Sequence, residues 1–211
     1  MTELEQNNNR EWFSANKPRY QAAHEEVKAF ANVLLDKMSH FDQIEKMRVH
    51  RIYRDVRFSK DKIPYKNSFS GGMSRATKYL RGSYYFHLEP GNSFVGGGFW
   101  GPNPEDLKRI RTDLAASPDQ LRQILQDPIF VKTFGELKGE QLKTAPKGFD
   151  KEHPAIELLR YKQFLISHSF SDKEVFSKEF STTVADTFGR MRPFLDYMSE
   201  VLTTDENGVP I

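Results

Sequence analysis

The chain of 211 residues contains no cysteine. This absence excludes disulfide bonds, thiolate catalysis, cysteine-ligated zinc or iron–sulfur sites and haem attachment through CxxCH. No stretch approaches the ~18 consecutive apolar residues that a membrane helix needs, and the first residues lack the basic and apolar pattern of a signal peptide. HExxH, GxSxG and P-loop motifs are missing as well. We therefore expect a cytoplasmic protein with no membrane partner, no cofactor and no metal, and the sequence by itself names no reaction.

Charge is abundant, and it is unevenly distributed along the chain. The formal net charge is only +2. Residues 48–82 nevertheless hold ten basic side chains and two acidic ones, so this window carries +8 and the rest of the chain carries −6. Aromatic residues are interleaved with the basic ones. The sequence therefore predicts a polarised molecule with one strongly basic segment.

Hydrophobic periodicity predicts a helix before the basic segment and a strand within it. Apolar residues between 23 and 38 recur at three- and four-residue intervals, and we expect Asn16 to cap this helix with Pro18 in its first turn. A shorter helical turn over 10–14 precedes it. Residues 49–58 alternate between apolar and polar side chains, which favours a strand.

The second half of the chain carries clear turn and helix-start signals. Pro90-Gly91-Asn92 separates two β-rich runs and predicts a hairpin. Asn103 and Pro104 are typical of a helix N-terminus. Further helices are expected to begin after Ser117-Pro118 and at Ser171, and apolar spacing predicts another over 184–202.

This order of elements indicates an α+β fold, in which N- and C-terminal helices pack on an antiparallel sheet of short strands from the central region. We expect one domain over residues 1–211. Its parts are N-terminal helices (1–43), a central β-rich basic segment (44–101) and a helical C-terminal part (102–211).

The first candidate site is the basic strand with its adjoining loop. Alternate side chains of a strand share one face about 7 Å apart, and two arginines beside a carboxylate and a phenol suit a phosphate or carboxylate. A salt-bridged sheet face is the structural alternative, but two acids cannot neutralise all the bases here. The residues predicted to bind an anionic ligand are Arg51, Tyr53, Arg54, Arg57, Lys60, Lys62, Tyr65 and Lys66.

Nucleic acid is the largest anion that suits such a segment, because cations neutralise its backbone and aromatic rings stack on its bases. The sequence pI of 8.6 lies below the ~9 that marks nucleic-acid-binding domains. We therefore slightly favour a small phosphorylated or carboxylated ligand. Two alternatives remain for a protein that binds a partner without catalysis: the basic segment binds nucleic acid, or it binds an acidic protein.

The second candidate site is His87 with Glu89, which share a strand face with Tyr85. A His-x-Glu pair binds a metal or shares a proton, and a simple hydrogen-bonded pair is the structural alternative. The spacing selects no third metal ligand. In an enzyme acting on the anionic ligand, the candidate proton-transfer groups are Asp55, His87 and Glu89.

A literal GxGxxG motif ends the predicted hairpin at Gly96, Gly98 and Gly101. Such a motif binds dinucleotides when it joins a strand to a helix within a βαβ unit. Here the preceding strand belongs to a hairpin, and two prolines follow where the helix should run. We therefore interpret these glycines as structural, allowing a strand to bulge or to pack closely against a neighbour.

Three motifs resemble those of an uncharacterised, mainly bacterial family known only as a conserved hypothetical domain of unknown function. They are NNNREWF at 7–13, RIYRDVRFSKDKIPYK at 51–66, and HLEPG leading into GGGFW across 87–100, and the likeness extends through 146–154. The resemblance implies a single-domain, cytoplasmic bacterial protein and supplies no catalytic residues. Family members usually begin with a further helix before the asparagines, so it also implies that this chain starts late in that helix.

Overall fold

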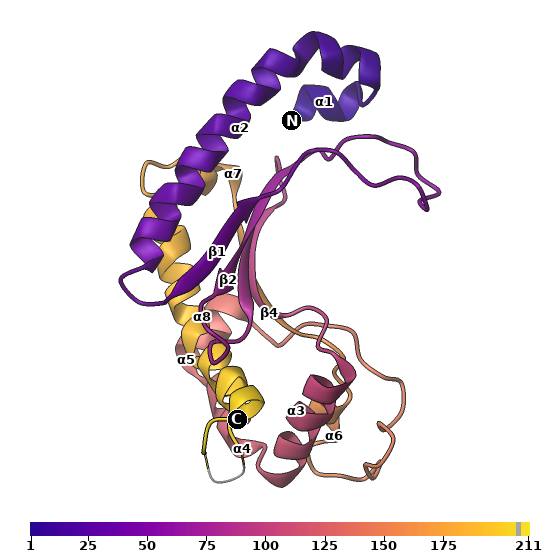
Figure 1. The fold of residues 1–211 in the computed structure, drawn as a ribbon, viewed down its shortest axis with the longest axis vertical. Helices are drawn as coiled ribbons and strands as arrows, with labels where there is room; N and C mark the ends of the chain where they lie inside the picture. The colour runs from indigo at the N-terminus through magenta and orange to yellow at the C-terminus, as the bar shows by residue number, and fades with distance from the viewer. Residues whose placement is uncertain (206–207) are drawn as a thin grey trace.

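The structure is a computed structural model that describes residues 1–205 and 208–211. The described residues form eight helices and one five-stranded sheet (Figure 1). In chain order the elements are α1 (Thr2–Gln6), α2 (Arg10–Met38), β1 (Ile44–Val49), β2 (Phe69–Arg75), β3 (Ser83–Leu88), β4 (Ser93–Phe99), α3 (Pro104–Ala116), α4 (Asp119–Gln126), α5 (Pro128–Phe134), α6 (Ile156–Leu159), β5 (Phe164–Phe170), α7 (Asp172–Val175) and α8 (Phe180–Thr203).

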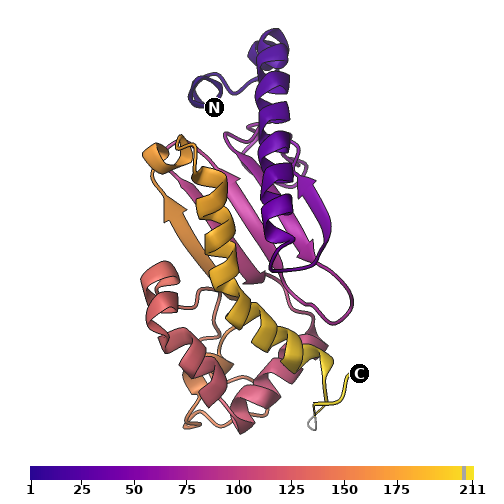
Figure 2. The same cartoon turned by 90° about the vertical axis from the view of Figure 1, so that its left-hand side faces the viewer.

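The sheet has the strand order β1-β2-β3-β4-β5, and every neighbouring pair is antiparallel. Helices α2 and α8 lie on the same face of it (Figure 2). The predicted α+β fold, with N- and C-terminal helices on a central antiparallel sheet, is confirmed. No helix in the described part of the chain is long and apolar enough to cross a membrane.

Alternation along the strands separates an apolar face from a polar one. Tyr84 and Phe86 of β3 are fully buried under the helices, and the Tyr84 ring lies 4.9 Å from that of Phe188 on α8. Their neighbours Tyr85 and His87 point to the opposite side, which we call the open face, and remain half-buried. The fold thus places the polar residues of β3 where a ligand can reach them.

A polar network is buried beneath the helices. The Arg75 guanidinium donates to Asp42 (Nε–Oδ2 2.8 Å) and also binds Asp196 on α8. The Tyr84 hydroxyl donates to the same Asp42 oxygen at 2.5 Å. The side chains of Arg75 and Asp42 are 0% and 1% exposed, so their charges are neutralised by protein groups rather than by water. Asp196 also pairs with Arg75, and Arg192 lies 3.8 Å from Asp42.

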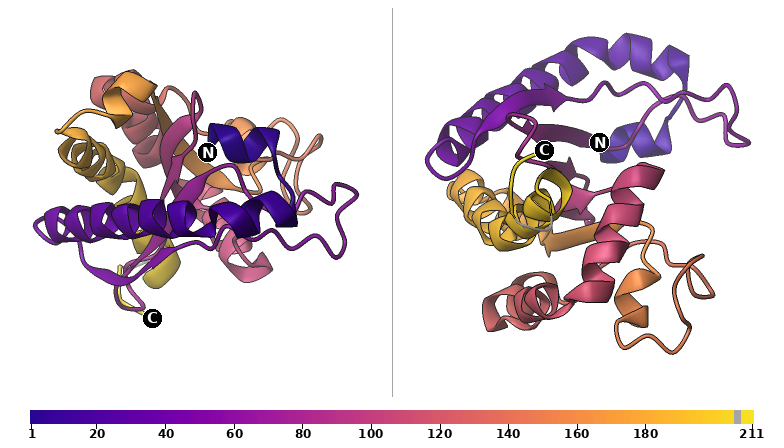
Figure 3. Two further views of the ribbon diagram at one scale, coloured as in Figure 1. Left: turned by 90° about the horizontal axis from the view of Figure 1, so that it is seen from above. Right: turned by 60° about the horizontal axis from the view of Figure 1, so that its bottom comes forward.

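A second, smaller core lies at the N-terminal end of the molecule. Leu4 of α1, Phe13 of α2 and two side chains from the β1–β2 connection, Ile52 and Tyr65, are buried together. The rings of Phe13 and Tyr65 stack with their centroids 4.0 Å apart. Figure 3 shows α1 folded back alongside the start of α2, close to this connection.

The long helix α2 begins earlier than the sequence predicts. Asn9, in extended conformation, caps it by accepting a hydrogen bond from the Trp12 amide at 2.9 Å, and Pro18 lies well inside the helix. The prediction that Asn16 caps a separate helix with Pro18 in its first turn is therefore wrong. Asn16 instead donates its side-chain N–H to the Trp12 carbonyl within the same helix (2.9 Å).

The predicted strand over residues 49–58 is also wrong, because β1 covers Ile44–Val49 and the pairing with β2 ends there. Residues 50–68 form a long connection, which we call the basic arm, projecting from the end of the sheet (Figure 1). A single Tyr53–Tyr65 bridge joins its two sides. Phe58, expected on the buried face of a strand, is 96% exposed.

Several turn and cap predictions are confirmed. The β3–β4 hairpin turns at Pro90-Gly91-Asn92, and the Asn103 side chain caps α3 by accepting from the Asp106 amide at 2.8 Å. Gly96 and Gly98 lie in β4 against the backbone of β5, which confirms the prediction of close strand packing at these two positions. Gly101 lies after β4 with nothing within 4 Å of its Cβ position, so the prediction is wrong there. Gly98 has φ +126°, and a Cβ there would lie 2.1 Å from the Phe164 carbonyl oxygen of β5.

Candidate functional site

A cavity of about 500 Å³ lies between the open face of the sheet, the basic arm and α1. Its floor comes from β2 and β3, where Ser70 pairs directly with His87. Tyr85 stands beside them with Gly72 and Gly96 as its two cross-strand partners. Because neither glycine has a side chain, the Tyr85 ring has no directly opposite side chain in the ladder; its ring contact on β4 is the diagonal neighbour Phe94, with the centroids 5.8 Å apart.

The cationic wall of the cavity comes from the basic arm and contains His50, Arg54 and Lys66. Arg54 already pairs with Asp61 of the arm at 2.7 Å. Lys66 is half-buried, and within residues 1–205 and 208–211 no carboxylate lies within ion-pair distance of it. Burial, and to a lesser extent the Arg51 charge, lowers the pKa of Lys66. The cavity wall therefore carries a partly desolvated cation with no protein counter-ion.

His50 lies at the base of this wall, next to the floor. Its Nδ1 is 3.1 Å from the Ser70 hydroxyl oxygen. Burial, followed by the charges of Lys66 and Arg48, lowers the pKa of His50, so the neutral imidazole is favoured. A neutral ring beside Ser70 supplies hydrogen-bonding capacity without adding charge.

Two hydrogen bonds between the Asn8 side chain and the Tyr65 backbone hold the cavity wall in place. Asn8 donates to the Tyr65 carbonyl at 3.0 Å and accepts from the Tyr65 amide at 3.2 Å. Tyr65 is thereby fixed against Phe13, and Lys66 follows it in the chain. The asparagine that precedes the α2 cap thus orders the part of the basic arm that faces the cavity.

Three side chains of the β3 hairpin form a continuous hydrogen-bonded chain. The Tyr85 hydroxyl is 3.2 Å from His87 Nδ1, and His87 Nε2 is 2.9 Å from Glu89 Oε2. Asn92 donates to the same Glu89 oxygen at 2.8 Å, and the Asn67 side chain also hydrogen-bonds Glu89. Burial raises the pKa of Glu89, but the hydrogen bonds from His87, Asn92 and Asn67 outweigh it and lower that pKa.

Of the residues predicted to bind an anion, Arg54, Tyr65 and Lys66 line the cavity, and the proposed proton-transfer residue His87 joins them there. The remaining arm residues lie elsewhere. Asp55 forms an exposed ion pair with Arg57 (2.6 Å). The residues of the basic arm that were predicted as ligands and lie outside the cavity lining are Arg51, Tyr53, Arg57, Lys60 and Lys62.

Sequence reasoning did not include Asn8, His50, Asn67 or Ser70 in the site. Asn8 follows α1, His50 and Asn67 lie near the two ends of the basic arm, and Ser70 lies in β2. Only the tertiary fold brings them together. The one available signal was the run Asn7-Asn8-Asn9, because helix capping uses only one of the three asparagines.

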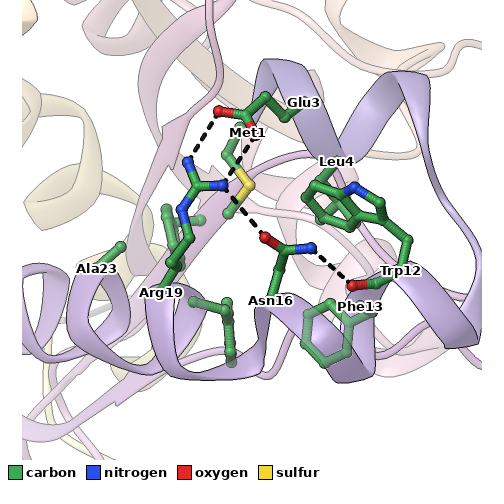
Figure 4. Close-up of a pocket in the computed structure, with 10 residues that line it drawn as sticks. Met1, Glu3, Leu4, Trp12, Phe13, Asn16, Arg19 and Ala23 are labelled. Atoms are coloured by element: carbon green, nitrogen blue, oxygen red, sulfur yellow. Dashed lines mark hydrogen bonds and ion pairs between the residues drawn. The ribbon is translucent and has the colours of Figure 1, made fainter.

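A second hollow, of about 180 Å³, lies between α1, α2 and Phe69 (Figure 4). Its polar side chains satisfy one another: Arg19 donates to Glu3 at 2.8 Å and to Asn16 at 3.2 Å. The rest of its lining is mainly apolar, including Leu4 and Trp12. This hollow therefore offers an anion no free cation and is a poorer candidate than the cavity on the open face.

The described part of the chain contains no cluster of side chains suited to metal coordination. No group of three or more His, Asp or Glu side chains among residues 1–205 and 208–211 is arranged to hold a metal ion. His87 and Glu89 instead satisfy each other.

One family model matches a region of the chain that contains every residue of this site. The chain belongs to the conserved hypothetical family DUF2461, whose profile matches residues 1–197. The resemblance expected from the sequence motifs is thereby confirmed. A search of curated proteins found no match.

Proposed function

We propose that this protein binds a small anionic ligand, carrying a phosphate or carboxylate group, in the cavity between the open face and the basic arm. The observation that carries the proposal is Lys66, a half-buried cation in the cavity wall without a carboxylate partner in the described chain. Burying a charge without a partner costs free energy. A bound anion supplies the missing partner.

Other polar groups around Lys66 contribute charge and hydrogen-bond donors to the proposed anion site. Arg54 extends the positive wall, and the hydroxyls of Ser70 and Tyr85 offer hydrogen bonds from the floor. The acids nearby are Glu5, which lines the cavity from α1, Glu89, which is engaged with His87, and Asp61, which pairs with Arg54. The volume of about 500 Å³ lies within the roughly 300–1,000 Å³ typical of small-molecule sites.

A small ligand is favoured over nucleic acid because the positive charge of the arm is partly neutralised locally. Arg54 and Arg57 each hold an acid of the same arm, at 2.7 and 2.6 Å. Fewer cations therefore remain for a long phosphate backbone than the sequence count indicates. Lys66, by contrast, faces a half-open cavity of ligand size.

Calorimetric titration with inorganic phosphate, nucleoside monophosphates and dicarboxylates tests the proposal. Lys66→Gln should weaken binding of the best anion about tenfold to a hundredfold, because a hydrogen bond to a charged group contributes about 1.5–3 kcal/mol. Lys60→Gln is the matched control: it removes the same charge from the same arm, at an exposed position outside the cavity.

Equal weakening by Lys66→Gln and Lys60→Gln, or the absence of binding by every anion, contradicts the proposal. A single-stranded oligonucleotide serves as a further ligand. If it binds and its affinity falls steeply with salt while the small anions do not bind, the nucleic-acid alternative takes its place. The cytoplasmic location and bacterial origin expected from the sequence remain predictions.

A further inference from the structure

The hydrogen-bonded series of side chains Tyr85–His87–Glu89 reaches the proposed ligand cavity at its Tyr85 end. All three residues alternate along β3 and its end, so their side chains follow one another along the open face. Tyr85 and His87 line the cavity, while Glu89 lies behind His87 and is held by two asparagines. An acid, an imidazole and a hydroxyl are thus connected in series, with the imidazole and the hydroxyl at the cavity.

The hydrogen bonds determine which nitrogen of His87 carries the proton. The lowered pKa of Glu89 keeps it a carboxylate, which accepts hydrogen bonds only, so His87 donates through Nε2. In a neutral ring Nδ1 then has a lone pair and accepts from the Tyr85 hydroxyl. His87 is therefore oriented to remove the phenolic proton.

The surroundings of the phenol leave room for a reacting group. Its cross-strand neighbours Gly72 and Gly96 carry no side chains, and a Cβ on Gly72 would approach His50 Nε2 to 4.0 Å. The His50 ring centroid lies 6.1 Å from that of Tyr85. The charged or titratable groups around this space are Glu5, His50, Arg54, Lys66, His87 and Glu89.

We propose that the cavity is a catalytic site for acyl or phosphoryl esters, with Tyr85 as nucleophile, His87 as general base and Glu89 as the residue that positions His87. This proposal rests on the proposed function, since Lys66 holds the anionic part of the ester. The arrangement follows the logic of an acid–histidine–hydroxyl triad, with a phenol in place of the serine hydroxyl.

Each step balances with groups already present and water. Tyr85 Oη forms a bond to the carbonyl carbon or phosphorus, its proton passes to His87 Nδ1, and Glu89 stabilises the imidazolium. The bond to the leaving alcohol then breaks, and the alcohol oxygen takes the electron pair and the proton from His87. Water, deprotonated by His87, attacks the tyrosyl ester, and Tyr85 recovers its proton as it leaves.

Reaction with sulfonyl fluorides tests the nucleophile without knowledge of the substrate. The phenol oxygen forms a bond to sulfur, fluoride leaves, and the proton passes to His87. Neutral benzenesulfonyl fluoride and the anionic para-carboxybenzenesulfonyl fluoride are compared, with labelled tyrosines located by mass spectrometry. Tyr79, 43% exposed and without a histidine partner in the described chain, is the internal reference.

We expect the neutral reagent to label Tyr85 about a hundredfold faster than Tyr79, the gain typical of a positioned general base. His87→Asn should remove this advantage, and Glu89→Gln should reduce it at least about tenfold while Tyr79 labelling stays unchanged. Nitrogen NMR should show an unprotonated His87 Nδ1 in the wild type and a mixture of tautomers in Glu89→Gln. The positioning role requires both effects together, the change of tautomer and the slower labelling of Tyr85.

Equal labelling of Tyr85 and Tyr79 by the neutral reagent overturns the nucleophile, whatever the anionic reagent does. Wild-type rates in Glu89→Gln overturn the positioning role. The anionic reagent tests the anion site separately, because its labelling of Tyr85 should be slowed by Lys66→Gln. If only this last effect is missing, the proposed function fails and the nucleophile stands.

Discussion

Replacement of Asp42 by asparagine should destabilise the fold strongly, because Asp42 balances a guanidinium that has no access to water. Both charged side chains of the Asp42–Arg75 pair are essentially unexposed, and Asp42 also accepts the Tyr84 hydroxyl. Removing one member of a buried pair typically costs about 3–5 kcal/mol. Arg75 retains its contact with Asp196, so we expect a loss near the lower end, about 3 kcal/mol.

Urea denaturation followed by circular dichroism measures this loss as a lower midpoint at unchanged slope. For a chain of this length the melting temperature should fall by roughly 6–12 °C. Tyr84→Phe, which removes one hydrogen bond to the same carboxylate, should cost about 1.5 kcal/mol.

Asp55→Asn is the matched control, because it removes the same charge from the exposed pair with Arg57, where solvent screens the interaction. Its effect should be far smaller than that of Asp42→Asn. If the two substitutions prove equally mild, the buried network does not stabilise the fold as argued. A changed denaturation slope would instead mean that Asp42→Asn alters the compactness of one of the two states.

Two further predictions concern the sheet and the cavity wall. Gly98→Ala should lower the free energy of unfolding by about 3 kcal/mol, because the φ of +126° and the Phe164 carbonyl leave no place for a Cβ. Gly101→Ala is the control: a Cβ at this position meets nothing within 4 Å, so the same denaturation assay should show almost no change. The depressed pKa of His50 means that the unfolded chain binds its proton more readily, so stability should fall as pH drops through the ordinary histidine pKa of 6.5 toward the lower folded value. The wild type should therefore lose more stability than His50→Gln between about pH 8 and about pH 5, and an equal loss would contradict the shift.

Local signals in the sequence predicted those parts of the fold that depend on local chemistry. Pro90-Gly91-Asn92 provides turn residues between two strands, and Asn103 with Pro104 provides a cap and a preset first turn, so both predictions needed only neighbouring residues. Asn9 and Asn16 are both good caps, and Pro18 favours a helix start. The packing of Phe13 into the small core outweighs that preference and extends α2 through the proline.

The basic arm shows why alternation alone was insufficient. Ile52 is buried as its periodicity suggests, but against Leu4 and Phe13 rather than on the sheet. Strand identity depends on a hydrogen-bonded partner, and β2 pairs only as far as Val49. Of the candidate site, the sequence therefore identified Lys66 and His87 individually, while their proximity depends on the path of the arm over the sheet.

The separation of the two cores has a consequence for how the cavity opens and closes. The small core that holds the arm and α1 has four fully buried side chains, supported by the Asn8–Tyr65 and Arg19–Glu3 contacts, and is much smaller than the core beneath the helices. We therefore expect this part of the molecule to be the less stable unit, whose amides exchange with solvent through partial opening while the sheet stays folded. A ligand that contacts both Lys66 and Tyr85 binds only the closed form, so it acts as a reversible cross-link between the weaker unit and the stronger one.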